Sequence, residues 1–105
     1  MAKITELKQH DLEEIINTNP VVLVDFYAPW CGACNTMGRV IDSNAEKIGD
    51  PDTLIVKVNT EKFVKISERQ GVSVLPTFQL YRNGKFIQEK TGVMPLAELN
   101  KLLEM

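Results

Sequence analysis

The sequence is poor in the residues that build metal centres, with one histidine and two cysteines among 105 residues. A closed structural zinc site needs four ligands, nearly always cysteine or histidine. Cys31, Cys34 and the distant His10 are too few to form one within the chain. A zinc ion or iron–sulfur cluster shared across a dimer stays open as an alternative. We therefore expect no metal and no bound cofactor.

Long apolar runs and strong charge are also lacking. The longest aliphatic run, Val21 to Val24, is far shorter than a membrane-spanning helix. A net charge of −2 without any run of lysine or arginine argues against nucleic acid as a partner. The first residues contain no apolar stretch typical of a secretory signal. We expect a cytoplasmic monomer that acts without nucleic acid or membrane.

The remaining composition is that of an ordinary globular protein, with 44% apolar and 25% charged residues. A chain of this length forms one domain, residues 1–105, and can bury a core without disulfide bonds. Structural disulfides are rare in the cytosol. The two cysteines therefore call for a chemical explanation.

Apolar periodicity alternates between that of strands and that of helices along the chain. The Asn83-Gly84 pair between two strand-like segments favours a two-residue hairpin. The order predicts an α/β fold whose mixed sheet has about five strands and helices on both faces. Strands are expected at 4–7, 21–26, 54–58, 77–81 and 85–90, and helices at 8–18, 31–48, 61–70 and 95–103.

The Cys-x-x-Cys sequence at Cys31 and Cys34 follows a buried strand and opens a helix. The first turn of a helix has unpaired N–H groups and the positive end of the helix dipole. A thiolate at Cys31 is therefore stabilised and nucleophilic near neutral pH. Cys34 lies one turn deeper on the same face and can attack a mixed disulfide formed by Cys31. Gly32 leaves room for a partner.

The alternative is that both cysteines only pack as small apolar side chains. Their position beside Trp30 and Gly32, at a strand-to-helix junction, favours redox function instead. We interpret the pair as a reversible disulfide centre.

Three segments together resemble the thioredoxin family, over nearly the whole chain. They are residues 24–34 (VDFYAPWCGAC), 71–77 (GVSVLPT) and 82–85 (RNGK), followed by the late Gly92. The resemblance implies the thioredoxin fold, with five strands and four helices. It also implies a general protein-disulfide reductase that is recharged by a thioredoxin reductase and acts on disulfide-containing proteins.

Asp25 lies inside an apolar strand, where burial raises the pKa of a carboxyl group. The resemblance implies that Asp25 lies behind Cys34 and takes its proton during resolution. Lys57 resembles the lysine that neighbours this aspartate, although a surface lysine whose stem packs on the sheet would look the same. An aspartate that reaches water from the strand end is the alternative for Asp25.

The resemblance further implies a cis peptide bond before Pro76, which would turn the Leu75 backbone toward the cysteines for pairing with a substrate strand. A proline that merely starts an edge strand is the alternative. The resemblance also implies an apolar docking rim formed by Trp30, Val74, Leu75, Gly92 and Val93, for which apolar residues scattered on the surface are the alternative. The redox motif and docking residues are Trp30, Gly32, Ala33, Val74, Leu75, Pro76, Thr77, Gly92 and Val93.

The chain departs from the family pattern at four positions. Ala33 replaces a common proline and should loosen the first turn of the helix. Arg39 also replaces a proline, so the helix can run straight or bend mildly at Gly38. Tyr27 stands where tryptophan is frequent, and Val74 makes the docking rim bulkier.

A binding module without redox activity, or an oxidase or isomerase, remains an alternative to the reductase.

Overall fold

The computed structural model describes residues 1–105 and has the predicted order of strands and helices. A short 3₁₀ segment after α2 is the one addition. The elements are β1 (Lys3–Glu6), α1 (Leu12–Thr18), β2 (Val21–Tyr27), α2 (Gly32–Ser43), η1 (Ala45–Lys47), β3 (Thr53–Asn59), α3 (Val64–Arg69), β4 (Thr77–Arg82), β5 (Lys85–Thr91) and α4 (Leu96–Leu103).

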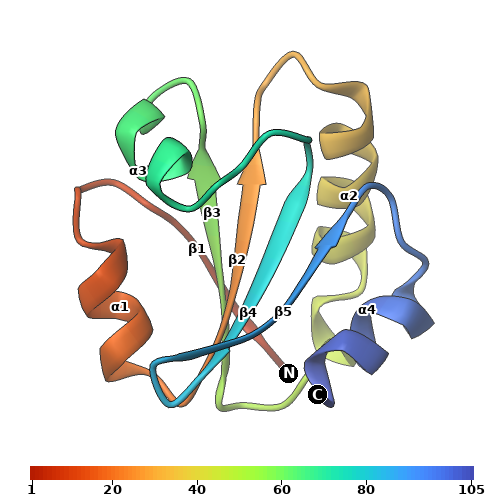
Figure 1. Cartoon of the computed structure of the whole chain (residues 1–105). Helices are drawn as coiled ribbons and strands as arrows, with labels where there is room; N and C mark the ends of the chain where they lie inside the picture. The colour runs from red at the N-terminus through yellow and green to blue at the C-terminus, as the bar shows by residue number, and fades with distance from the viewer.

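The five strands form one mixed sheet in the order β1-β3-β2-β4-β5 (Figure 1). β3 pairs in parallel with both β1 and β2, whereas β4 pairs antiparallel with β2 and β5. The central strand β2 is buried at six of its seven positions, as its apolar run predicted. The hairpin forms at Asn83 and Gly84, where φ angles of 52° and 82° fit the predicted two-residue turn.

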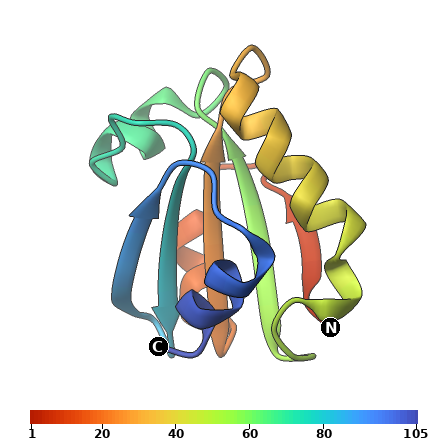
Figure 2. The same ribbon diagram turned by 90° about the vertical axis from the view of Figure 1, so that its right-hand side faces the viewer.

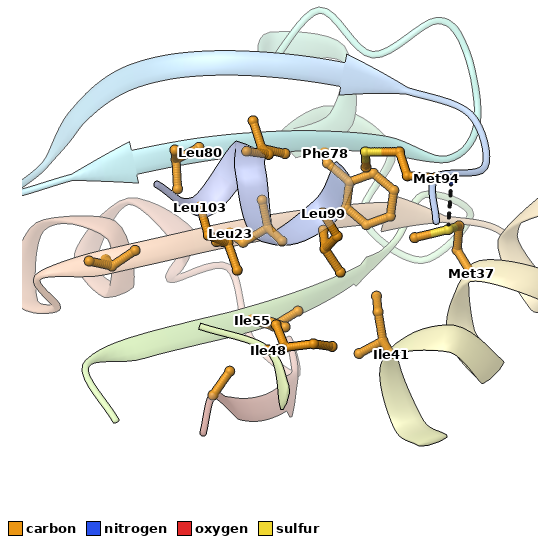
Figure 3. Close-up of a cluster of buried hydrophobic side chains, with 13 residues drawn as sticks. Leu23, Met37, Ile41, Ile48, Ile55, Phe78, Leu80, Met94, Leu99 and Leu103 are labelled. Carbon is orange, nitrogen blue, oxygen red and sulfur yellow. Dashed lines mark hydrogen bonds between the residues drawn. The ribbon is translucent and has the colours of Figure 1, made fainter. Parts of the chain in front are cut away.

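Helices cover both faces of the sheet, and each face has its own apolar core. Figure 2 shows α2 and α4 in front of the strands, with α1 behind them. Met37 and Ile41 of α2 pack with Leu99 of α4 over Leu23 and other strand residues (Figure 3). On the opposite face, α1 and α3 cover the second core, which contains Leu12, Ile16, Val22, Val24, Phe26, Val56, Val58 and Ile66.

Three helices differ from their predicted ranges by more than one residue at an end. α1 begins at Leu12 because residues 9–10 form a bend, so His10 lies before the helix and not in it. α2 ends at Ser43 because Asn44 leaves helical geometry and donates its N–H to Ile41. The apolar stripe therefore reaches Ile48 through η1, not through a continuous helix. α3 spans only Val64–Arg69 of the predicted 61–70.

Candidate active site

The two cysteines lie where β2 gives way to α2. Cys31 is the N-cap of α2, with extended backbone angles of φ −84° and ψ 116°, and Cys34 is the third residue of the helix. The Cys34 N–H donates to the Cys31 Sγ at 3.2 Å, so sulfur occupies the place that a serine or aspartate oxygen takes in an ordinary cap. Both thiols are free and buried. The helix terminus thus presents a positive partial charge to the Cys31 sulfur.

Cys34 holds its proton more firmly than an ordinary cysteine. Burial raises the pKa of the Cys34 thiol well above its usual range, and hydrogen bonding with Cys31 raises it further. At neutral pH, Cys34 is therefore a neutral thiol. Removal of its proton near neutral pH would require a base nearby.

Asp25 is a buried carboxyl group on the central strand, with only 3% of its surface exposed. Its Oδ1 atom has no hydrogen-bond partner. Burial raises the pKa of Asp25 from 3.8 to about 7, against the opposing charge of Lys57, while Glu6 and Asp42 add to the rise. The group therefore exchanges a proton near neutral pH, as its position in an apolar strand predicted.

Asp25 and Cys34 line the same pocket, which has a volume of about 310 Å³. Exposed side chains of α2 also line it, so the pocket opens to the surface. Both groups therefore face one space that is open to solvent. The other lining residues are Tyr27, Asn35, Gly38, Arg39, Asp42 and Lys57.

The segment before β4 packs beside the cysteines. The Leu75–Pro76 peptide bond is cis, as the resemblance implied. Leu75 packs against the small apolar cluster formed by Ala28, Cys31 and Cys34. Outside the helices and strands, no backbone hydrogen bond involves the N–H or C=O of Leu75. These two groups therefore have no backbone partner within the chain.

The residues expected near the docking rim differ in how far they are exposed. Trp30, Val74 and Val93 are 71%, 51% and 53% exposed. Gly92 lies beside the loop before β4 because its N–H donates to the Pro76 carbonyl at 2.9 Å. Pro76 itself is buried.

Three other residues expected near the motif differ in exposure. Thr77 is buried, and its hydroxyl donates to the Val74 carbonyl. This hydrogen bond connects β4 to the loop that contains Leu75 and Pro76. Gly32 is exposed, with open space where a side chain would begin, and Ala33 is half-buried.

Sequence reasoning missed two acidic residues near Asp25. Glu6 on β1 and Asp42 on α2 are close enough to raise its pKa. They are distant from Asp25 in sequence, and Glu6 comes near it only because residues 6, 57 and 25 lie in register on three adjacent strands, which no single segment of the sequence indicates.

α2 continues through Gly38 and Arg39 as one helix. Beneath it, the Met94 N–H donates to the Met37 Sδ at 3.1 Å, as the dashed line in Figure 3 shows. This bond, which sequence reasoning also missed, ties the segment after Val93 to the helix that carries Cys34.

No three histidine, cysteine, aspartate or glutamate side chains are grouped closely enough to hold a metal ion. None of the helices combines the length and the apolar character needed to span a bilayer.

Comparisons with known proteins agree with this geometry. A sequence model of the thioredoxin family matches residues 3–105. The thioredoxin of Griffithsia pacifica is 41% identical over 91 residues, which cover 86% of this chain and 83% of that protein. Chloroplastic thioredoxin Y of Oryza sativa subsp. japonica is also 41% identical, over 79% of this chain but only 49% of its own length. Reduced Schistosoma mansoni thioredoxin superposes with a TM-score of 0.84 at 30% identity, over 97% of this chain and 96% of that one.

The fold and the cysteine pair define a protein-disulfide oxidoreductase. The chain belongs to the thioredoxin family, as its full-length match and its relatives show. Members of this family use their own cysteine pair as the redox centre, and they generally work with a thioredoxin reductase and with disulfide substrates.

Proposed function

We propose that the chain is a general reductase of disulfide bonds in other proteins. The Cys31 thiolate attacks one sulfur of the substrate disulfide, forms a mixed disulfide and releases the other sulfur as a thiolate, which takes a proton. Cys34 then loses its proton and attacks the Cys31 Sγ. The substrate's second sulfur leaves and is protonated, the substrate has gained two electrons, and the chain holds a Cys31–Cys34 disulfide.

The observation that carries this proposal is the hydrogen bond from the Cys34 N–H to the Cys31 Sγ at 3.2 Å. It joins the two sulfur-bearing residues within one helical turn. It also aims a helix N-terminus at the sulfur that must become an anion. A pair of cysteines kept only for packing needs no such alignment.

Asp25 serves as the base for Cys34 in this scheme. Its pKa of about 7 leaves a substantial fraction of carboxylate at neutral pH, ready to accept a proton through the shared pocket. An aspartate with its ordinary pKa would be a weaker base. Lys57 supplies the opposite charge that keeps Asp25 from remaining fully protonated.

The substrate docks beside the cis-proline loop. The free N–H and C=O of Leu75 offer two hydrogen bonds to an extended substrate segment. Trp30, Val74 and Val93 supply the exposed apolar surface around it, and Gly92 keeps the rim close to Pro76. Neither Gly32 nor Ala33 has a side chain large enough to block the approach to Cys31.

A thioredoxin reductase returns the Cys31–Cys34 disulfide to the dithiol, so no bound cofactor is required. The chain works as a single-domain monomer in the cytoplasm, with electron transport between proteins as its role and without nucleic acid or membrane. The match of the family to residues 3–105 and the general partners of that family support this view.

Insulin reduction by dithiothreitol tests the proposal. The parent protein should accelerate the reaction, and Cys31→Ser should abolish the acceleration. When it is mixed with insulin in the absence of dithiothreitol, Cys34→Ser, which retains the attacking sulfur but lacks the resolving one, should accumulate a mixed disulfide visible by mass spectrometry. A parent protein with no activity above the uncatalysed rate would show that the fold is a binding module. Accumulation of a mixed disulfide in Cys31→Ser instead would reverse the two roles.

A further inference from the structure

We propose that Glu6 and Tyr27 are positioning residues that hold the Lys57 ammonium beside Asp25 and thereby tune proton transfer from Cys34. The inference rests on the proposed role of Asp25 as the base. It adds two residues on two different strands to that role.

The first observation is a row of charges across three strands. In the parallel pairing, Lys57 on β3 is opposite Glu6 on β1 and opposite Asp25 on β2. Residues in register on neighbouring strands point to the same face of a sheet. Lys57 therefore has a carboxyl group on either side, one exposed and one buried. Its ammonium can be drawn toward either of them.

The second observation is a bridge over β3. The Tyr27 hydroxyl donates to the Glu6 Oε2 at 2.7 Å, which joins β2 to β1 across the strand that carries Lys57. The Lys57 Nζ lies 5.0 Å from the centroid of the Tyr27 ring, within range of a cation–π attraction. The bridge thus engages the Glu6 carboxylate, and the ring holds the ammonium.

The pocket gives this arrangement its effect on Asp25. Tyr27, Lys57 and Asp25 line the same space as Cys34. Asp25 Oδ1 has no hydrogen-bond partner, so its ionisation responds to charges across the pocket.

The charged groups around Asp25 act in opposite directions. Lys57 on β3 lowers the pKa of Asp25, whereas Glu6 on β1 and Asp42 on α2 raise it. Arg39 on α2 also lines the pocket. Burial and the hydrogen bond to Glu6 raise the pKa of Tyr27, so its hydroxyl remains a donor throughout the neutral range.

Two substitutions should move the ionisation of Asp25 in opposite directions. Glu6→Gln retains an acceptor for the Tyr27 hydroxyl but removes the negative charge, so the pKa of Asp25 should fall. Tyr27→Phe retains the ring but frees Glu6 to pair directly with Lys57, so the ammonium should move away and the pKa of Asp25 should rise. Each change should be about threefold in the ionisation constant, or about half a pH unit. A residue with only a structural role would not produce opposite shifts.

The experiment follows the Asp25 carboxyl carbon by NMR as a function of pH in the reduced protein, together with the pH dependence of mixed-disulfide resolution. Both midpoints should move down in Glu6→Gln and up in Tyr27→Phe. Glu13→Gln, which removes the same charge from α1 on the opposite face, should leave both midpoints unchanged. Midpoints that stay fixed in Glu6→Gln and Tyr27→Phe, or that move in the same direction, would overturn the inference.

Asp25→Asn separates this inference from the function on which it rests. If Asp25→Asn leaves resolution unaffected across the neutral range, Asp25 is not the base and both statements fail. If Asp25→Asn slows resolution and removes its pH dependence while Glu6→Gln leaves the midpoint unchanged, only the inference fails. Because Glu6 is exposed, Glu6→Gln should fold even if Tyr27→Phe does not.

Discussion

Replacement of Asp25 by asparagine should remove a pH-dependent penalty on folding. In the unfolded chain Asp25 ionises near 3.8, and in the folded protein its pKa is about 7. Between these values the folded state binds more protons than the unfolded state, so folding stability falls as pH rises through this window. The penalty is absent below about pH 4 and complete above about pH 7. Asparagine carries no charge at any of these values and should not show it.

The size of the effect follows from the two pKa values. A rise from 3.8 to about 7 corresponds to about 4 kcal/mol, at about 1.4 kcal/mol for each pH unit. This is a large part of the roughly 5–15 kcal/mol that stabilises a typical domain. The free energy of unfolding of Asp25→Asn, relative to the parent, should therefore increase by about 4 kcal/mol between about pH 4 and pH 8.

Urea unfolding of both reduced proteins at a series of pH values measures this difference. Its absolute value also contains the cost of burying an amide, about 1–3 kcal/mol, so the slope with pH is the decisive quantity. Asp52→Asn, at an exposed position, serves as the control and should give a flat difference. A difference for Asp25→Asn that stays constant with pH would show that the buried carboxyl does not titrate in this window, and the reasoning about Asp25 as a base would fall with it.

Three further substitutions test other parts of the structure. Ala33→Pro should stiffen the first turn of α2 and make the reduction potential of the cysteine pair more negative. Titration of both proteins against glutathione buffers measures the two potentials, and equal potentials would contradict the prediction. Met37→Leu removes the acceptor of the buried Met94 N–H, so the free energy of unfolding in urea should fall by about 1–3 kcal/mol. Hydrogen exchange at the Met94 amide should also become faster, and an unchanged exchange rate would exclude the bond. Gly49→Ala should lower the free energy of thermal unfolding by about 1 kcal/mol or more, because the φ angle of Gly49 is +56° and the new Cβ would lie 2.6 Å from the Thr53 Oγ1. Full retention of stability would contradict this strain.

The sheet and its layers could be predicted because their signals are local and strong. The apolar run beginning at Val21 marked the central strand, and Asn83-Gly84 marked the hairpin. Helix ends were less predictable because they depend on single residues. The end of α2 at Ser43 depends on the backbone of Asn44, although the apolar stripe continues to Ile48.

The site divides in the same way. The position of Cys31 and Cys34 at the start of α2 is a local arrangement, so spacing and context were enough to predict it, although the hydrogen bond from the Cys34 N–H to the Cys31 Sγ was not predicted. The contacts of Tyr27 with Glu6 and with Lys57 depend on the register of three strands. The sequence of one strand alone does not determine its register with its neighbours. Residues that tune a site from neighbouring strands are therefore harder to predict than the residues that react.

The role that we propose for Asp25, as the base for Cys34, explains why its pKa would need such tuning. A base must be strong enough to take a proton from Cys34, yet must still be ionised at working pH, and these two demands oppose each other. Burial alone satisfies the first demand and, if unopposed, would leave the carboxyl protonated. Lys57 opposes burial, and the pKa of about 7 is the balance between them. A lysine free to turn toward the exposed Glu6 would weaken that balance, which gives a physical reason for the Tyr27 bridge to engage Glu6.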